Sequence, residues 1–260
     1  MVTFERFIML EMRVNLDMLN LRAAPVNGTI LAALPRGHAV TTAGPSGTDG
    51  WVKVGTKVNG HEVEGVVAER RLRALVSAAK ESLMSAAVAE WLQFDRGSGK
   101  ENEEPYFRFV GKMWDAIGLN LDGRDRDQPW SAAFISWCVR TAGYNGFKFA
   151  AAHARYIHDS IKKKLAGEES PFWGWRIGEQ KAELGDMVCQ WRNTPRTYDQ
   201  AAAADGFFSH CDIIVEVGDG FVRALGGNNS DTVNYKRYNL TAAGNLLSER
   251  KVFAILKNRN

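Results

Sequence analysis

Short apolar stretches separated by turn signals fill the first quarter of the chain. Between residues 12 and 68 they are divided by Gly- and Pro-containing turns, among them Asn27-Gly28 and Asn59-Gly60. Short strands that alternate with such turns are typical of small β-barrels. The pattern therefore predicts an N-terminal all-β barrel over residues 1–68.

The apolar spacing becomes helical beyond this point. Five residues follow the i, i+3, i+4, i+7 spacing of one helix face: Leu72, Leu75, Val76, Ala79 and Leu83. The polar run RGSGKENEE at 96–104 then indicates a loop. We expect residues 69–104 to form a helical linker between two domains.

Further helices and then strands are expected in the remainder, residues 105–260. Helices are predicted after Pro105, after Pro129 and over residues 150–165. Alternating or apolar runs after Pro171 predict five strands, at 186–192, 210–217, 220–227, 232–238 and 251–257. Helices followed by an antiparallel sheet predict the α+β class, and the insertion at 193–208 is expected to be a long loop.

Composition narrows the function classes. The net charge of +3, from 33 basic and 30 acidic residues, gives no reason to expect a nucleic-acid partner. No apolar run approaches the roughly 20 residues of a membrane span, and the first residues make a poor secretory signal. Three widely spaced cysteines and five histidines form no zinc pattern, so we expect no metal and no cofactor.

Three motifs in the N-terminal part resemble the bacterial SH3-type domain. They are LNLRAAP at 19–25, LPRGHAV at 34–40 and GWVKV at 50–54. The resemblance implies an SH3-like barrel that binds cell-wall peptides. A packing or protein-docking barrel without a ligand remains the alternative, because a fold does not by itself define a function.

Four motifs in the C-terminal part resemble papain-like peptidoglycan hydrolases of the NlpC and CHAP kind. In order, they are PWSAAF at 129–134, ELGDMV at 183–188, SHCDIIVEV at 209–217 and ALGGNNSDTV at 224–233. The resemblance implies a domain of helices packed on an antiparallel sheet. It also implies a nucleophile at the position of Ser131, where close relatives carry Cys and a domain-of-unknown-function branch carries Ser.

The same resemblance implies a set of roles around Ser131. His210 is the expected general base, and Asn228 is expected to orient its imidazole. Four further residues are expected near the oxyanion or in the cleft: Trp130, Ala132, His153 and Asp212. A nucleophile at a helix N-terminus is surrounded by free backbone N–H groups that stabilise an oxyanion.

The serine leaves alternatives open. A hydroxyl does not ionise as readily as a thiol, so Ser131 requires a true general base. Ser131 could instead be a helix N-cap, since serine is favoured there. Cys138 is a rival nucleophile on the same helix face, but it lies about 10 Å deeper among apolar residues and is expected to pack in the core.

The sequence thus predicts a peptidoglycan amide hydrolase with a Ser–His–Asn site. The expected partner is peptidoglycan or its stem peptides, in the periplasm or outside the cell. Since no clear signal peptide is visible, the protein is expected either to reach the wall by another route or to have lost its leader. The alternatives are an inactive wall-binding module and a cargo or effector of a phage-like or contractile secretion apparatus.

Overall fold

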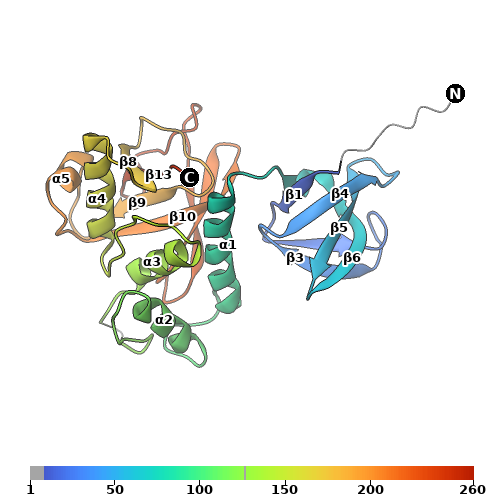
Figure 1. Ribbon diagram of the computed structural model, residues 1–260, viewed down its shortest axis with the longest axis horizontal. Coiled ribbons are helices and arrows are strands. Elements are labelled where there is room, and N and C mark those ends of the chain that lie inside the picture. Colours follow the sequence, from blue (N-terminus) through green and yellow to red (C-terminus); the bar gives the residue numbers. More distant parts are fainter. Residues whose placement is uncertain (1–8, 126) are drawn as a thin grey trace. The chain divides into compact units, whose positions relative to one another are not determined.

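The computed structural model describes residues 9–125 and 127–260, and the chain divides into two compact units. The first unit ends at Val76, and the second runs from Ser77 to Asn260. Both contain an antiparallel sheet, and the described helices of four or more residues all belong to the second unit (Figure 1). The expected α+β class is confirmed.

The first unit is a seven-stranded antiparallel sheet of short strands. Its strands are β1 (Glu11–Val14), β2 (Met18–Arg22), β3 (Ile30–Pro35), β4 (Ala39–Pro45), β5 (Trp51–Val58), β6 (His61–Ala68) and β7 (Leu72–Arg73). The hydrogen-bonded order is β3-β2-β6-β5-β4-β1-β7. This order begins and ends on different strands, so within the described residues backbone pairing does not close the sheet into a barrel.

Alternation along the strands places one face of this sheet in a core. In β5, for example, Val52, Val54 and Thr56 are buried while their neighbours are more exposed. Eight apolar residues form the cluster: Val14, Leu19, Leu21, Leu34, Val40, Val52, Val54 and Val67. The tight turn between β5 and β6 uses Asn59 and Gly60, both with positive φ, as the Asn-Gly signal predicts.

Within its described residues, the second unit contains five α-helices and a six-stranded sheet. The helices are α1 (Ala78–Gln93), α2 (Tyr106–Asp115), α3 (Ser131–Thr141), α4 (His153–Ala166) and α5 (Tyr198–Ala203). The strands are β8 (Phe172–Arg176), β9 (Met187–Trp191), β10 (Ser209–Gly218), β11 (Phe221–Gly226), β12 (Asn234–Asn239) and β13 (Val252–Asn258). Their order in the sheet is β12-β11-β10-β9-β13-β8.

The central strands of this sheet are buried on both faces. β10 pairs with β9 and β11, and its residues from His210 to Val215 are all buried. Helices α1, α3 and α4 contact β10, and α4 also packs on β8. The position of β10 is therefore fixed by its two neighbouring strands and by the helices packed on it.

Three segments differ from the sequence-based expectation. Leu72–Arg73 forms strand β7, because it pairs with Arg13 and Val14 of β1 instead of entering a helix. Helix α1 belongs to the second unit and packs against α3, so residues 69–104 do not behave as a separate linker. The expected loop at 193–208 contains helix α5, which starts at a capping box between Thr197 and Gln200.

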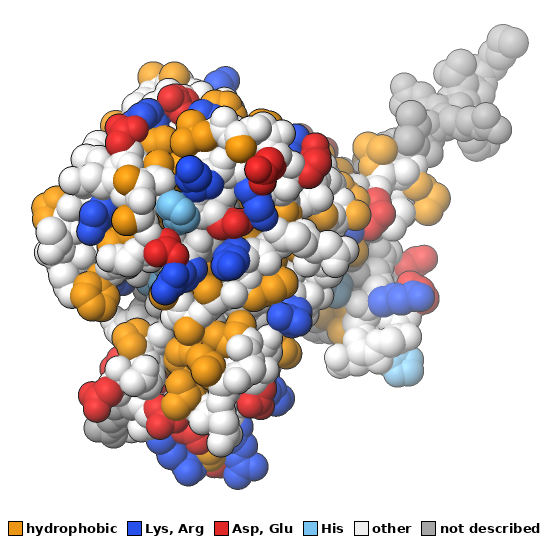
Figure 2. All heavy atoms as spheres, turned by 60° about the vertical axis from the view of Figure 1, so that its left-hand side comes forward, with side chains coloured by type: hydrophobic (Ala, Val, Ile, Leu, Met, Phe, Trp, Pro, Cys, Tyr) orange, Lys and Arg blue, Asp and Glu red, His pale blue; other side chains and the backbone are white. Residues whose placement is uncertain are grey.

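The surface mixes charge types. Figure 2 shows basic and acidic side chains interspersed with apolar ones on the face it presents. No helix in residues 9–125 and 127–260 is long and apolar enough to cross a membrane.

Close packing between α4 and β8 gives a test of the fold. A Cβ on Gly174 would lie 2.5 Å from Ile161 Cγ1 and 3.0 Å from the Ile161 backbone nitrogen. Since α4 would have to move, we expect Gly174→Ala to lower the free energy of unfolding by about 1–3 kcal/mol. Gly178→Ala is the control, since a Cβ there meets nothing within 4 Å. Equal denaturation midpoints for the two variants would contradict this packing.

Candidate active site

Helix α3 begins where a buried tryptophan fixes the entering chain. Trp130 is 1% exposed and stacks on Phe94 with ring centroids 5.5 Å apart. The first intrahelical bond runs from the Phe134 N–H to the Trp130 carbonyl. Ser131 is thus the first helical residue, and the N–H groups of residues 131–133 have no acceptor within the helix.

The Ser131 hydroxyl is buried and bonded to a histidine. Its Oγ lies 2.7 Å from Nε2 of His153, the first residue of α4. No side-chain cap bond is formed at the start of α3, so Ser131 is not acting as an N-cap. The hydroxyl therefore points away from its own helix and toward an imidazole.

A tyrosine one helical turn later fixes His153 from the other side. The Tyr156 hydroxyl bonds to Nδ1 of His153, as the i, i+3 spacing on α4 allows. Burial lowers the pKa of His153 well below its usual range and raises the pKa of Tyr156 well above its usual range. The imidazole is therefore neutral, and with Nδ1–H donated to Tyr156 its Nε2 can accept the Ser131 proton.

A second imidazole faces the same region from the sheet. His210 on β10 is 2% exposed, and its ring centroid lies 5.0 Å from that of His153. Its Nε2 donates to Asp212 Oδ1 at 2.8 Å, because residues i and i+2 of a strand share a face. This bond leaves Nδ1 of the neutral imidazole free to accept a proton.

Asp212 is a fully buried carboxylate with several donors. Besides His210, it accepts from the Tyr238 hydroxyl, from Asn229 Nδ2 at 3.2 Å and from Lys236 Nζ at 3.4 Å. Burial alone would raise the pKa of Asp212, but His210, Lys236 and Tyr238 together hold that pKa well below its usual range. The carboxylate is therefore charged. Burial lowers the pKa of His210, and the charge of Asp212 opposes this effect without outweighing it.

Two glycines allow this network to fit against α3. A Cβ on Gly226 would lie 1.8 Å from Asp212 Oδ1, and a Cβ on Gly227 would lie 2.5 Å from Phe134 Cβ. The Gly-Gly pair in the motif ALGGNNSDTV is thus needed for the close approach of β11 to both the carboxylate and the helix.

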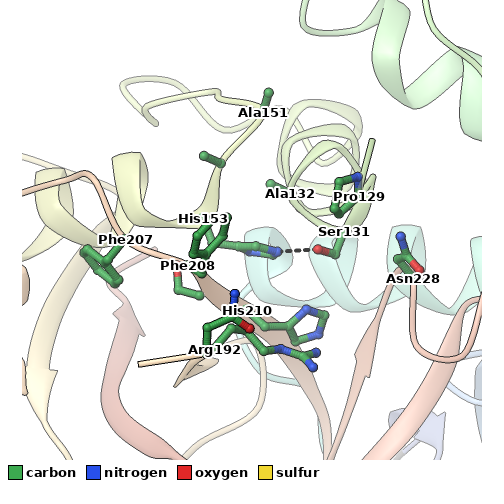
Figure 3. Close-up of a pocket in the computed structure, with 13 residues that line it drawn as sticks. Pro129, Ser131, Ala132, Ala151, His153, Arg192, Phe207, Phe208, His210 and Asn228 are labelled. Carbon is green, nitrogen blue, oxygen red and sulfur yellow. Dashed lines mark hydrogen bonds between the residues drawn. The ribbon is translucent and has the colours of Figure 1, made fainter. Parts of the chain in front are cut away.

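The serine and both histidines open into a cleft of about 520 Å³. Its lining is Pro129, Ser131, Ala132, Ala151, Ala152, His153, Arg192, Asn193, Phe207, Phe208, Ser209, His210 and Asn228. Figure 3 shows His153 reaching Ser131 from one side, His210 and Arg192 beneath it, and Asn228 on the other side. Such a cleft can admit an extended substrate to the hydroxyl.

The structure places several of these residues in contacts other than those expected from the sequence. Ser131 is bonded to His153 and has no hydrogen bond to His210, whose ring is held by Asp212 in place of Asn228. Asn228 lies in the cleft with φ of 52°, while its neighbour Asn229 turns back to Asp212. Expected cleft residues Trp130 and Asp212 are buried behind the cleft, whereas Ala132 and His153 line it.

Sequence spacing alone could have indicated two of these side-chain pairs. The i, i+3 pair His153 and Tyr156 and the i, i+2 pair His210 and Asp212 each place a histidine beside its partner on one face. The contact between Ser131 and His153 has no such local signal, because it joins two helices.

The rival nucleophile is excluded by its surroundings. Cys138 is fully buried, and burial raises the pKa of its thiol well above its usual range. Cys189 and Cys211 are also buried, with sulfurs 3.2 Å apart on neighbouring strands. No cluster of three or more metal-ligating side chains occurs among residues 9–125 and 127–260.

The buried imidazoles predict a pH-dependent stability. The pKa values of His153 and His210 are both lowered in the fold from an ordinary 6.5, so the unfolded chain binds more protons below that pH. We expect the free energy of unfolding of the second unit to be highest above pH 6.5 and to fall as the pH drops toward 5.5. Urea unfolding across this range measures it, with His153→Gln showing a shallower slope. A stability that is flat between pH 5.5 and 7.5 would disprove the neutral, buried state of both rings.

Comparison with known proteins identifies a sequence family. The family described as an uncharacterized protein conserved in bacteria, DUF2272, matches residues 88–259. This range contains every residue of the site described above. Among curated proteins, none matches the chain.

Two solved structures align with the chain at low scores. The NlpC2 structure from Trichomonas vaginalis aligns at 13% identity and a TM-score of 0.32, covering 95% of this chain and 72% of that chain. The NlpC1 structure from the same organism aligns at 12% identity and a TM-score of 0.30, with 92% and 68% covered. Scores this low do not establish a common fold.

Proposed function

This chain belongs to the DUF2272 family, and we propose that it hydrolyses an amide bond of peptidoglycan with Ser131 as the nucleophile. One observation carries the proposal. The Ser131 hydroxyl, at the start of a helix and in an open cleft, lies 2.7 Å from the Nε2 atom of a neutral imidazole. This is the arrangement that an activated serine requires.

In the proposed first step, His153 takes the Ser131 proton as Oγ attacks the carbonyl carbon of the amide. The carbonyl oxygen gains a negative charge, which the N–H groups at the start of α3, near Ala132, can stabilise. His153 then gives the proton to the leaving amine, and an ester on Ser131 remains. Water, deprotonated by the same imidazole, hydrolyses the ester and restores Ser131. These steps use only groups of the chain and water.

The buried carboxylate has a defined part in this cycle. When His153 becomes an imidazolium, its positive charge is unfavourable in a buried position and beside His210. The negative charge of Asp212 raises the pKa of His153 and so opposes these effects. His210 lies between the two and positions the carboxylate through its bond at 2.8 Å. In this proposal His153, rather than His210, is the general base.

Peptidoglycan as the substrate class rests on the sequence motifs. PWSAAF, ELGDMV, SHCDIIVEV and ALGGNNSDTV occur in the order found in papain-like wall hydrolases, and all four contribute to the site or its supporting strands. The scissile amide is proposed to lie in a stem peptide or between the sugar and the peptide. The first unit is proposed to bind the wall, as its SH3-type motifs predict.

The assignment of the base can be tested on purified sacculi. Release of muropeptides, followed by mass spectrometry, is expected for the wild type and absent for Ser131→Ala. Replacing His153 by Gln is expected to lower kcat by about 10²–10⁴-fold, the contribution typical of a general base. His210→Gln is expected to cost less, because Asp212 still carries its charge.

The opposite ranking of the two histidine variants would assign the base to His210, as the sequence motifs alone suggest. Unchanged muropeptides after incubation of several wall chemotypes with the wild type would reject the hydrolase and favour a wall-binding module. Circular dichroism on each variant controls for loss of the fold.

A further inference from the structure

A second hollow adjoins the cleft on the side of Arg192. Its volume is about 220 Å³, and it is lined by Gln190, Trp191, Arg192, Lys236, Arg250 and Lys251. Arg192 also lines the cleft that contains Ser131, so the two spaces share this side chain. Four of the six lining residues are basic, and no acidic residue lines the hollow.

Two of these basic residues, Arg250 and Lys251, lie in a turn whose backbone conformation is unfavourable for them. The Val252 N–H bonds to the Glu249 carbonyl at 3.0 Å, and the central residues Arg250 and Lys251 have φ of 50° and 68°. Two successive left-handed residues make the mirror-image turn for which Asn-Gly is strongly preferred. The chain instead places two long cationic side chains there, and strained backbone of this kind gathers at functional sites.

The turn is held rigidly by strand β9. Gln190 Nε2 donates to the Arg250 carbonyl at 2.5 Å, and the Trp191 N–H donates to the Lys251 carbonyl at 3.0 Å. Lys251 Nζ lies 4.9 Å from the centre of the Trp191 ring. The backbone that carries Arg250 and Lys251 is thus held in place by hydrogen bonds to β9.

The positive charge in this hollow is poorly compensated. Lys236 contacts Asp212 at 3.4 Å, but that carboxylate already accepts from His210, Tyr238 and Asn229. Arg192, Arg250 and Lys251 have no ion pair within residues 9–125 and 127–260. Burial lowers the pKa of Lys236, the charge of Asp212 raises it and the charge of Arg192 lowers it again, so the pairing with Asp212 only partly offsets the repulsion between Lys236 and Arg192.

We propose that this basic hollow binds a carboxylate of the substrate while the neighbouring amide lies against Ser131. The inference rests on the proposed function, because it places the anion beside the scissile bond of a wall peptide. A planar guanidinium matches a carboxylate with two parallel N–H bonds, and Arg192 is placed to serve both spaces. The proposed substrate is therefore an amide flanked by a free carboxylate, and amidated stem peptides are poor ligands.

Binding is measured by calorimetry in the Ser131→Ala background, so that no cleavage occurs. The probes are a synthetic stem tripeptide with free carboxylates and the same tripeptide with every carboxylate amidated. We expect amidation to weaken binding by roughly 10-fold or more, as for a lost charge-assisted hydrogen bond. Inorganic phosphate, added as competitor, is expected to displace the peptide only at concentrations well above the peptide Kd.

The turn supplies a variant that separates binding from folding. Arg250→Asn with Lys251→Gly installs the preferred turn residues, so Tm is expected to be unchanged or higher while peptide affinity falls roughly 10-fold or more. Arg192→Gln is expected to lower affinity by a similar factor. The matched control removes two exposed cations elsewhere in the second unit, Lys148→Gln with Lys162→Gln, and is expected to retain full affinity.

Equal affinity for free and amidated peptides, or full affinity after Arg250→Asn with Lys251→Gly, overturns the proposal. If phosphate displaces the peptide at concentrations equal to or below the peptide Kd, the proposal of a carboxylate site is overturned and the hollow is assigned to phosphate. If the peptide binds through its carboxylates but the wild type leaves sacculi uncleaved, the carboxylate site in the hollow is supported and only the proposed hydrolase activity is rejected.

Discussion

The proposed hydrolysis depends on one buried contact between two helices, the hydrogen bond from Ser131 to His153. A hydroxyl at the start of α3 has backbone N–H groups around it, but these groups cannot remove its proton. The imidazole at the start of α4 can do so, because burial keeps it neutral and, when Nδ1–H donates to Tyr156, Nε2 is left to accept the proton. The packing of α3 and α4 against β10 determines whether these two atoms meet.

The residues around Asp212 stabilise the negative charge of its buried carboxylate. Asp212 is stable as an anion only because His210, Lys236 and Tyr238 surround it, and Gly226 leaves the space it occupies. Its charge in turn supports a proton on the nearby imidazoles. Beyond it, the cations around Arg192 and the turn at Arg250 lack such compensation, which is why a ligand with its own negative charge is the natural partner there.

Local patterns determined what the sequence could reveal. Pro129 before an apolar helical run located the start of α3 and hence Ser131, and alternation in SHCDIIVEV located β10 and hence His210. The pairing of Ser131 with His153 could not be read, because it depends on how α4 packs against the sheet. The resemblance of ALGGNNSDTV to the family motif predicts Asn228 as the partner of His210. In the structure Asn228 lines the cleft, and Asp212, which shares a strand face with His210, bonds to its ring. The turn at Arg250 and Lys251 was missed since neither residue favours a left-handed backbone.

The central claim is that the Ser131 hydroxyl is an activated nucleophile. A phosphonofluoridate probe tests it, because an activated serine forms a P–O bond and fluoride leaves. Digestion and mass spectrometry after exposure should place one adduct on the peptide that contains Ser131, with labelling strongly reduced in His153→Gln. Absence of an adduct on Ser131 in the folded wild type, or equal labelling when His153 is replaced, would contradict the account.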